Sequence, residues 1–410
     1  MLSWADPRTR RPSSDALGPV AFADLLGAGT ALSLVTTWLS RGERGRILPG
    51  GVGPHTGVAR LTGVADGALP AQDVSHRTAR FPVGASASLD ALERDPYPTY
   101  ARMLEQEPIS WVPALGMYYV VRYADVVAIL YDPVRFTVGT DQSVLFDTFG
   151  LHMLSIDGEL HDRYKSAFHE AFLPAALRTR MREHIRAHVD RLIDGFADRS
   201  HVELRSALAS RLPVLTMLSL FGLPLEREPD IRRWYDSFEH ALANFQWCED
   251  IRWQAHRSVQ ELERVVRDRM QFYRGAPQPD ALLSALVCAP AASRLSDEEI
   301  FRNTLIVMFG GVDLQPGDTV NCIIAAANRD PRKFVAPNCF DIDRPGLRQH
   351  LGFAIGPHHC LGSNLARLEG GIAIERLLAR LPSWHLYDAV ASAPRGSEFR
   401  RPGRLELALA

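Results

Sequence analysis

A lone cysteine, Cys360, stands at the end of a short loop that also contains phenylalanine, glycine and histidine. The residues after it, 361–378, are apolar at the spacing of one helix face, so Cys360 is expected directly before a helix begins. The N–H groups and the dipole at such an N-terminus favour negative charge, and a thiol there ionises more easily. A thiolate in a backbone-lined loop can serve as a nucleophile or as a ligand for a soft metal.

Three neighbouring residues favour the ligand over the nucleophile. Gly356 has no side chain and lets the loop approach a flat group closely. Phe353 supplies an aromatic wall, and His358, two residues before the sulfur, can donate to a carboxylate at the edge of that group. This combination predicts a thiolate-ligated haem, with Cys360 as the axial ligand of the iron and His358 beside a propionate.

The run 353–362 has the pattern F-x-x-G-x-H-x-C-L-G and is followed by Leu-Ala-Arg at 365–367. It resembles the haem-binding loop of the cytochrome P-450 family, with one departure: Ala354 stands where that family usually has glycine. The resemblance implies a mainly helical α+β fold with small β-sheets and one haem b. Within the loop it assigns haem binding to five residues: Phe353, Gly356, His358, Cys360 and Gly362.

A possible carboxylate clamp lies on the segment 156–174. His161 and Lys165 are four residues apart and therefore share one face of the predicted helix. Such a pair is commonly part of a solvated face. In the family, however, the corresponding helix carries a His-x-x-x-Arg pair that holds a haem propionate, which implies this role for His161 and Lys165. Lysine keeps the charge but loses the bidentate fork of arginine.

In the family that this loop resembles, a long central helix crosses the other face of the haem. Ser296 and Glu299 form a capping-box pattern that predicts a helix start. The run 300–309 is apolar on nearly all sides, as in a buried helix. It resembles the first half of the long central helix of the family, which continues with a kink, an acid and a threonine that deliver protons to oxygen.

The chain departs from the family pattern directly after this run. Pro316-Gly317 predicts a type II turn between strands at 312–314 and 319–325. In the family that hairpin comes only after the rest of the central helix and a further helix with a Glu-x-x-Arg motif. An internal block is therefore expected to be missing between residues 311 and 312, and the fold to be incomplete. Three Glu-x-x-Arg matches elsewhere are interpreted as ordinary helix-surface pairs: Glu183/Arg186, Glu261/Arg264 and Glu299/Arg302.

Composition restricts the remaining function classes. The chain has 410 residues, of which 46% are hydrophobic, and a formal net charge of −2. Its arginines are scattered among acidic residues without a polybasic tract, which argues against a nucleic-acid partner. The five cysteines form no C-x-x-C pair, which predicts a reducing, cytoplasmic setting without structural disulfides or a zinc site.

Residues 1–80 are rich in Gly, Ala, Pro, Ser and Arg. They are predicted to be a low-complexity N-terminal extension with little ordered structure, and residues 81–410 to be the cytochrome P-450-like haem domain. The apolar run 17–39 is flanked by arginines, as a membrane anchor would be, but Asp24 lies inside it. A charge within a span costs a few kcal/mol, so membrane insertion is disfavoured.

The resemblance implies a haem-thiolate monooxygenase that inserts one oxygen atom of O2 into a small apolar molecule, with electrons from a ferredoxin and ferredoxin reductase. The missing block supports a second hypothesis, a catalytically defective haem-binding remnant, because its loss opens the distal side to water. Neither Asp313 nor Thr319 is assigned a catalytic role. A third hypothesis, a cysteine-nucleophile hydrolase, lacks an evident orienting acid, and haem absorbance would exclude it.

Overall fold

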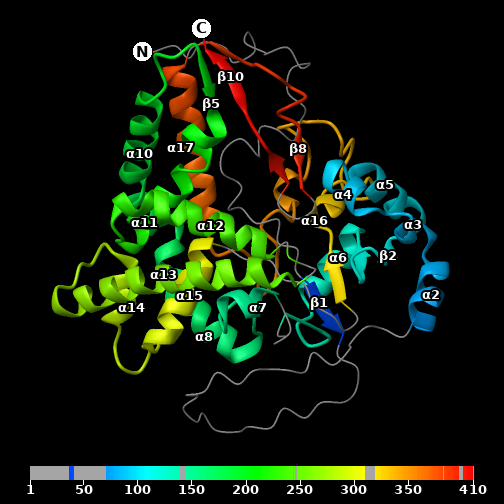
Figure 1. The fold of residues 1–410 in the computed structure, drawn as a ribbon, viewed down its shortest axis with the longest axis horizontal. Helices are drawn as coiled ribbons and strands as arrows, with labels where there is room; N and C mark the ends of the chain where they lie inside the picture. Colours follow the sequence, from blue (N-terminus) through cyan, green and yellow to red (C-terminus); the bar gives the residue numbers. More distant parts are fainter. Residues whose placement is uncertain are drawn as a thin grey trace.

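The computed structural model describes residues 37–40, 71–138, 144–242, 244, 247–309, 319–381, 383–396 and 400–409. These residues form a helical half and a mixed half that holds the largest sheet (Figure 1). The predicted mainly helical fold with small sheets is confirmed.

The helical half contains the largest hydrophobic core. The amphipathic patterns at 175–197 and 204–221 predict two continuous helices, but each is interrupted. The first breaks at Met181, and the second opens with a π-helical turn at Arg205–Ala209. The helices of this half that precede the central one are α9 (Pro174–Arg180), α10 (Arg182–Asp194), α11 (Leu212–Phe221), α12 (Glu228–Leu242), α13 (Glu249–Gly275) and α14 (Leu282–Val287).

Three further helices position the site: α8 (Gly158–His169), α15 (Asp297–Phe309) and α17 (Ser363–Arg380). The predicted capping box at the start of α15 is present. The Ser296 N–H donates to the Glu299 carboxylate at 2.7 Å, and the Glu299 N–H donates to Ser296 Oγ at 3.2 Å. Helix α17 runs alongside α10 through the helical half (Figure 1).

The mixed half begins earlier than the sequence predicts. Its helix α2 (Ala71–Arg80) falls within the segment expected to lack order, yet it packs against the sheet: the Arg77 guanidinium lies 5.1 Å from the centre of the Trp111 ring. The remaining short helices of this half are α3 (Pro82–Ala85), α4 (Leu89–Arg94), α5 (Tyr97–Gln106), α6 (Tyr123–Leu130) and α16 (Ile324–Ala327). The short helix α7 (Val144–Phe149) packs instead against α12 and α13 in the helical half.

The main sheet has five strands in the order β2-β3-β6-β1-β4. The apolar runs 109–113 and 117–121, joined by a turn at 115–116, predict a hairpin, and they form β2 (Ile109–Val112) and β3 (Met117–Val120). Strand β6 (Thr319–Cys322) pairs parallel to β3. The strand predicted over 319–325 therefore stops at Cys322, because α16 follows. The predicted strand at 312–314 and the Pro316-Gly317 turn lie outside the described residues. The other two strands are β1 (Thr37–Ser40) and β4 (Phe136–Thr137).

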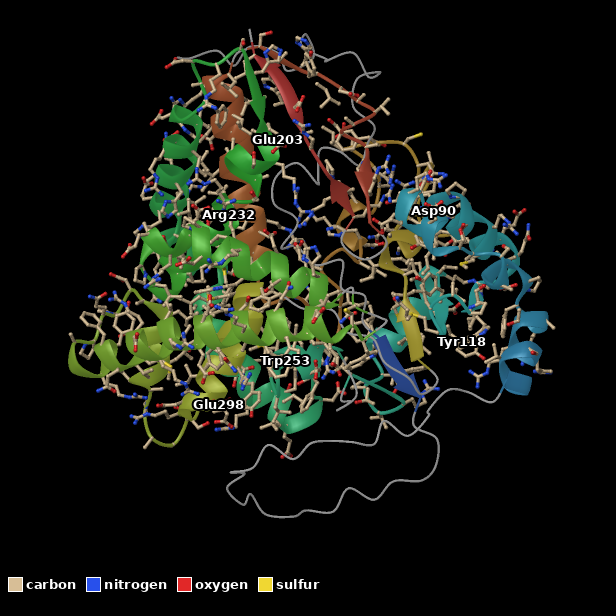
Figure 2. All side chains as sticks on the ribbon, in the orientation of Figure 1. Asp90, Tyr118, Glu203, Arg232, Trp253 and Glu298 are labelled. Atoms are coloured by element: carbon tan, nitrogen blue, oxygen red, sulfur yellow. The ribbon has the colours of Figure 1, made fainter. Side chains whose placement is uncertain are left out.

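Two smaller sheets lie near the C-terminus: a three-stranded sheet of β5 (His201–Glu203), β10 (Glu406–Leu409) and β7 (Trp384–Leu386), and the pair β8 (Pro394–Arg395) and β9 (Arg401–Pro402). Charged side chains such as Glu298 cover the outer surface of the helical half (Figure 2). Among the described residues, no helix combines the length and apolarity needed to cross a membrane.

Candidate haem site

The loop 351–362 folds back on itself before α17 begins. The Cys360 N–H donates to the Phe353 carbonyl at 2.9 Å, and the His359 N–H donates to the Gly356 carbonyl at 3.0 Å. These bonds place Cys360 three residues before the first residue of α17, as predicted. The N–H groups of Gly362 and Ser363 lower the pKa of the Cys360 thiol, and the Ser363 N–H donates to the Cys360 carbonyl at 3.3 Å. Helix-terminal donors therefore converge on the thiol.

The thiol is nevertheless harder to ionise than its position suggests. Cys360 is only 8% exposed. This burial raises the pKa of the thiol to about 11, against the opposing effects of the Gly362 N–H and of the charges on Lys165 and Arg367. The easy ionisation expected from the helix N-terminus is therefore outweighed by desolvation in the haem-free chain. Coordination to a metal would release the proton, because a ligating thiol is deprotonated on binding.

Gly356 is also required by the loop for a reason that the sequence does not reveal. Its φ is +74°, and a Cβ there would lie 2.4 Å from the backbone oxygen of Leu130, at the end of α6. The close approach is therefore to a neighbouring helix. Phe353 likewise packs with the small cluster under the loop, and the Arg367 guanidinium lies 4.4 Å from its ring centre.

Ala354 occupies a strained position. Its φ is +49°, in the left-handed region, and the residue is 2% exposed. An L-residue with a Cβ costs roughly 1–2 kcal/mol in that region, whereas glycine avoids the clash. The departure of this chain from the family loop therefore carries a local conformational cost.

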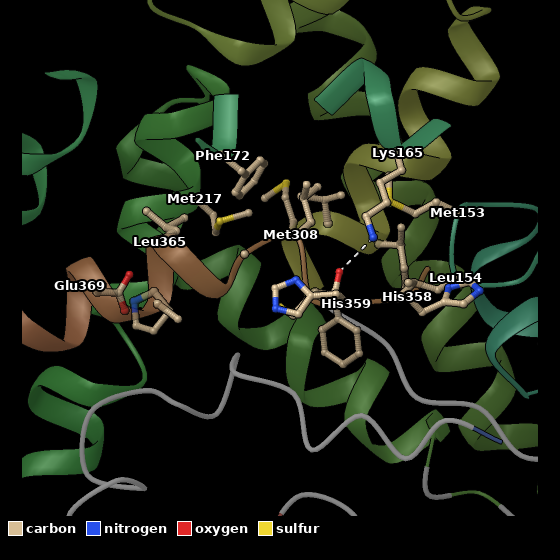
Figure 3. Close-up of a pocket in the computed structure, with 18 of the residues that line it drawn as sticks. Met153, Leu154, Lys165, Phe172, Met217, Met308, His358, His359, Leu365 and Glu369 are labelled. Atoms are coloured by element: carbon tan, nitrogen blue, oxygen red, sulfur yellow. Dashed lines mark hydrogen bonds between the residues drawn. The ribbon is translucent and has the colours of Figure 1, made fainter. Parts of the chain in front are cut away.

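A cavity opens directly beside Cys360 and encloses about 850 Å³ of unfilled space, part of it open to solvent (Figure 3). One wall is the last turn of α15, and another is the first half of α17. Of the predicted site residues, five line this cavity: His161, Lys165, His358, Cys360 and Gly362. Phe353 and Gly356 do not line it. The remaining lining residues are Met153, Leu154, Phe172, Pro213, Met217, Ile306, Val307, Met308, Phe309, His359, Leu361, Leu365, Ala366 and Glu369.

Two buried histidines meet at one end of the cavity. The rings of His161 and His358 lie 4.4 Å apart between centroids, and both residues are at most 3% exposed. His358 Nε2 donates to Asp157 Oδ1 at 2.8 Å. Burial raises the pKa of Asp157, but the hydrogen bonds from His358 and Thr137 outweigh it, so the pKa lies below its usual value. Asp157 therefore holds His358 as an anionic partner.

Lys165 braces the loop from α8. Its ammonium group donates to the carbonyls of Pro357 and His359, the latter at 3.0 Å. The bond to His359 is visible in Figure 3. An ammonium has three N–H donors, so one remains for a carboxylate at the rim of the cavity. Burial lowers the pKa of Lys165, although the Cys360 thiol opposes that effect.

The wall formed by α15 is apolar and held from behind by aromatic side chains. The Tyr235 hydroxyl donates to the Met308 carbonyl at 2.7 Å, which satisfies an acceptor near the end of the described helix. The Phe309 ring contacts those of Phe149, Phe238 and Tyr235, with centroids 5.3 to 5.5 Å apart. The wall is therefore fixed in place although the chain is described only as far as residue 309.

Sequence reasoning missed two residues that matter to the site. Asp157 orients His358 from 201 positions away, and only the segment on which it lies was recognisable. Glu369 lines the cavity from α17 at 5% exposure. It lies nine residues after Cys360, so helical spacing could have placed it on the cavity side, but nothing in the sequence marks it as buried.

The donor set fits haem b: a thiol at the floor, apolar walls on both sides and a cationic rim at one end. Such a set suits a flat apolar ring whose only charged groups are carboxylates at its edge. It does not suit nucleophilic catalysis. At about 11, the pKa of Cys360 leaves almost no thiolate at neutral pH, and the acid next to the histidines is bound to His358.

Comparisons with known proteins agree with this donor set. The family model for cytochrome P-450 matches residues 303–388. Cytochrome P-450 107B1 of Saccharopolyspora erythraea is 28% identical over 371 aligned positions, which cover 72% of this chain and 89% of the relative. Because 72% of 410 residues is about 295, about 76 of the 371 positions belong to the relative alone. A missing internal block would produce unmatched positions of this kind.

Two solved structures have the same fold. Cytochrome P-450 PksS of the Bacillus subtilis bacillaene polyketide synthase superposes with a TM-score of 0.68 and 24% identity, over 78% of this chain and 98% of that one. P450BioI, solved in complex with an acyl carrier protein ligated to hexadec-9Z-enoic acid, gives a TM-score of 0.68 and 23% identity, over 79% and 100%. Motif, alignment and fold are all similar to those of the cytochrome P-450 family, whose members bind haem b through a cysteine thiolate and act as monooxygenases.

Proposed function

We propose that this chain inserts one oxygen atom of O2 into a small apolar molecule, with electrons delivered by a ferredoxin and ferredoxin reductase. The observation that carries the proposal is that Cys360 and the apolar end of α15 line the same cavity. A haem bound through the thiolate supplies the oxygen-activating chemistry, and the thiolate donates electron density that favours O–O cleavage.

Each cavity residue has a proposed part in holding the cofactor. Cys360 binds the iron as thiolate, and the N–H groups of Gly362 and Ser363 stabilise its negative charge. At the rim, His161, Lys165 and His358 face the propionates. Lys165 can do this without releasing the loop, because two of its donors already hold the Pro357 and His359 carbonyls.

The proposed substrate is apolar because the described wall of the cavity is apolar. Four of the lining residues come from the last turn of α15 and are apolar: Ile306, Val307, Met308 and Phe309. Met153 extends the wall, and its N–H is fixed to the Asn303 side chain at 2.8 Å. Burial of apolar surface against such a wall favours a hydrocarbon-rich ligand.

The same wall supports the second candidate, a haem-binding remnant without turnover. Within the described part of α15, the residues that line the cavity carry no acid or alcohol that could hold a proton near bound oxygen. Asp313 lies outside the described residues, and Thr319 belongs to β6. A remnant would bind haem and accept electrons but release them as reduced oxygen.

A coupled turnover assay separates the two candidates. The purified chain would receive a ferredoxin, its reductase, NADPH, O2 and free hexadec-9Z-enoic acid as the first apolar probe, with Cys360→Ala as the control. We expect a product that carries one added oxygen, absent in the control. Electron consumption that yields only hydrogen peroxide over a panel of apolar probes would overturn the monooxygenase proposal and leave the remnant.

The setting proposed from the sequence is a reducing cytoplasm. All five cysteines are unpaired, and Cys248, Cys288 and Cys339 are exposed. Exposed free thiols persist most readily where glutathione and thioredoxin keep them reduced. This supports the proposed location and the intracellular source of electrons.

A further inference from the structure

The strand β1 comes from the N-terminal extension, yet it occupies an interior position in the main sheet. It pairs antiparallel with β6 on one side, where Trp38 lies opposite Val320. On its other side it pairs antiparallel with β4, where Leu39 lies opposite Thr137 and Ser40 opposite Phe136. In Figure 1 the strand lies beside β6, far in sequence from its neighbours. Residues 37–40 therefore join two segments about 180 positions apart.

Both neighbours of β1 depend on it for backbone pairing. Strand β6 pairs with β3 on one edge, and β1 covers its other edge. Among the described strands, the two-residue β4 pairs with β1 alone. Without β1, the N–H and C=O groups along these edges would need other partners, and so short a strand as β4 would lose its place in the sheet.

Each neighbour leads directly to the haem loop. At the end of β4, the Thr137 hydroxyl donates to Asp157 at 2.5 Å, and the N–H of the next residue, Val138, donates to the same carboxylate at 3.0 Å; Asp157 in turn accepts from His358. At the end of β6, Cys322 packs in one cluster with Ala354 and Cys360. The strand therefore lies between the two supports of the loop that presents the sulfur.

We propose that residues 37–40 are a positioning strand for the haem site. Because β1 pairs with β4 and β6 at once, it fixes the position of the Asp157–His358 contact relative to the cluster that contains Cys360. Residues 37–40 of the N-terminal extension then contribute directly to the fold. The expected effect on haem content rests on the proposed function. The expected effects on hydrogen exchange and melting do not depend on haem.

The first test needs no variant. Hydrogen exchange of the full-length chain, followed in peptides that cover residues 37–40, 136–138 and 319–322, reports whether the strand is paired. We expect amides of all three segments to be protected together, because they belong to one ladder. Exchange of residues 37–40 at the rate of an unstructured peptide would overturn the proposal, whatever the chain does with haem.

The second test breaks the strand at its backbone. Leu39→Pro removes an N–H and cannot be accommodated in an interior strand, whereas Leu39→Ala removes only the side chain and Leu61→Pro places the same change outside β1. We expect Leu39→Pro to lose protection at 136–138 and 319–322, to melt at a lower temperature and to retain less haem per chain. Both controls should match wild type in exchange at these segments.

The outcomes separate this proposal from the proposed function. If Leu39→Pro matches Leu61→Pro in exchange, melting and haem content, the positioning role is wrong. If wild type is protected at 37–40 but never binds haem, the proposed function fails while the strand itself remains. If Leu39→Pro does not fold at all while both controls do, the strand is required for the fold that carries the loop, as proposed.

Discussion

At the scale of single residues, two opposing effects act on Cys360. The donors at the start of α17 and the charges of Lys165 and Arg367 lower the pKa of the thiol, and burial raises it to about 11. Burial is the larger effect, so the site is built for a ligand that loses its proton only when the metal arrives. A free nucleophile would need the opposite balance.

Gly356 offers a sharp test of the loop. In Gly356→Ala the new Cβ would lie 2.4 Å from the Leu130 oxygen, at a φ of +74°. We expect a loss of roughly 2–4 kcal/mol in stability, from overpacking and backbone strain combined, together with weaker haem retention. Urea unfolding and haem content per chain measure these effects.

Gly371→Ala is the matched control. Gly371 lies within α17 at an exposed position, and a Cβ there meets nothing within 4 Å. Alanine is the better helix former, so this change should stabilise the chain by about 0.5–1 kcal/mol. Equal effects of the two substitutions would show that the contact with α6 does not constrain the loop.

Glu369 should make stability depend on pH in the haem-free chain. Burial raises its pKa to about 8 from the usual 4.5. The folded chain therefore holds a proton that the unfolded chain releases, and stability falls as pH rises from about 4.5 to about 8. Glu369→Gln should remove this slope and be more stable than wild type at about pH 8.5, by up to a few kcal/mol. If the stability measured by urea unfolding changed equally with pH in wild type and in Glu369→Gln across that range, Glu369 would not be a buried neutral acid.

The residue scale also marks what the sequence could reveal. Cys360, His358 and the His161/Lys165 pair were recognisable because a motif fixes their spacing, and they do line one cavity. Asp157 was not recognisable as the partner of His358, because a contact across 201 residues leaves no local pattern. The sequence showed that Ala354 replaces the usual glycine, but only its positive φ shows that the replacement strains the backbone.

At the scale of elements, periodicity located the helices but not their interruptions. The break at Met181 has no glycine or proline at the point of change, so it arises where tertiary packing overrides a continuous apolar stripe, which local propensity does not encode. The interruption before α11 does carry a local signal: Pro213 is the second residue of that helix, and a proline is tolerated only in the first turn. The capping box of α15 was predictable because both of its partners lie within four residues.

The contact of α7 with α13 gives a prediction at this scale. Asp147 on α7 accepts from Nε and Nη2 of Arg252, at 3.0 and 2.6 Å, and lies near His256. Burial would raise the pKa of Asp147, but the bonds from His256 and Arg252 hold it at about 2. Asp147→Asn should cost about 1–2 kcal/mol near pH 5–6, because it leaves the cations unpaired.

The pH dependence of this contact follows from both partners. The contribution of Asp147 is present above its unfolded pKa of 3.8 and is lost as pH falls towards about 2. The Asp147 hydrogen bond raises the pKa of His256, so that contribution is present below 6.5 and is lost as pH rises through the folded value. The melting temperature of Asp147→Asn should therefore fall furthest below that of the exposed-pair control Asp90→Asn between pH 3.8 and pH 6.5. A difference that persisted unchanged to pH 2 would contradict the ion-pair account.

At the scale of the whole molecule, the extension changes how the chain is understood. Low-complexity composition predicts little structure before residue 81, yet α2 packs on the sheet and β1 lies within it. Residues 37–40 carry no turn signal or alternation that would mark a strand. Their order comes from two open sheet edges supplied by distant segments, and a sequence read locally contains neither edge.

The missing block, in contrast, is predicted from the sequence alone, because the hairpin motif follows the central-helix motif sooner than in the family. The alignment with the Saccharopolyspora relative leaves about 76 positions of that relative unmatched, which is consistent with missing segments. The physical consequence of the missing block depends on how the remaining parts close around the cavity. The aromatic support of Phe309 and the bond from Tyr235 to Met308 show that the described wall does not rely on the absent half-helix.

The measurement that tests the central claim most directly is the absorption spectrum of the purified chain, reduced and bound to carbon monoxide, beside Cys360→Ser and the exposed-cysteine control Cys288→Ser. The account predicts a strongly red-shifted Soret band in wild type and Cys288→Ser, and its loss in Cys360→Ser, because only Cys360 reaches the cavity. A Soret band at its normal position in wild type, or no Soret band at all, would contradict the claim that this chain holds haem through the Cys360 thiolate.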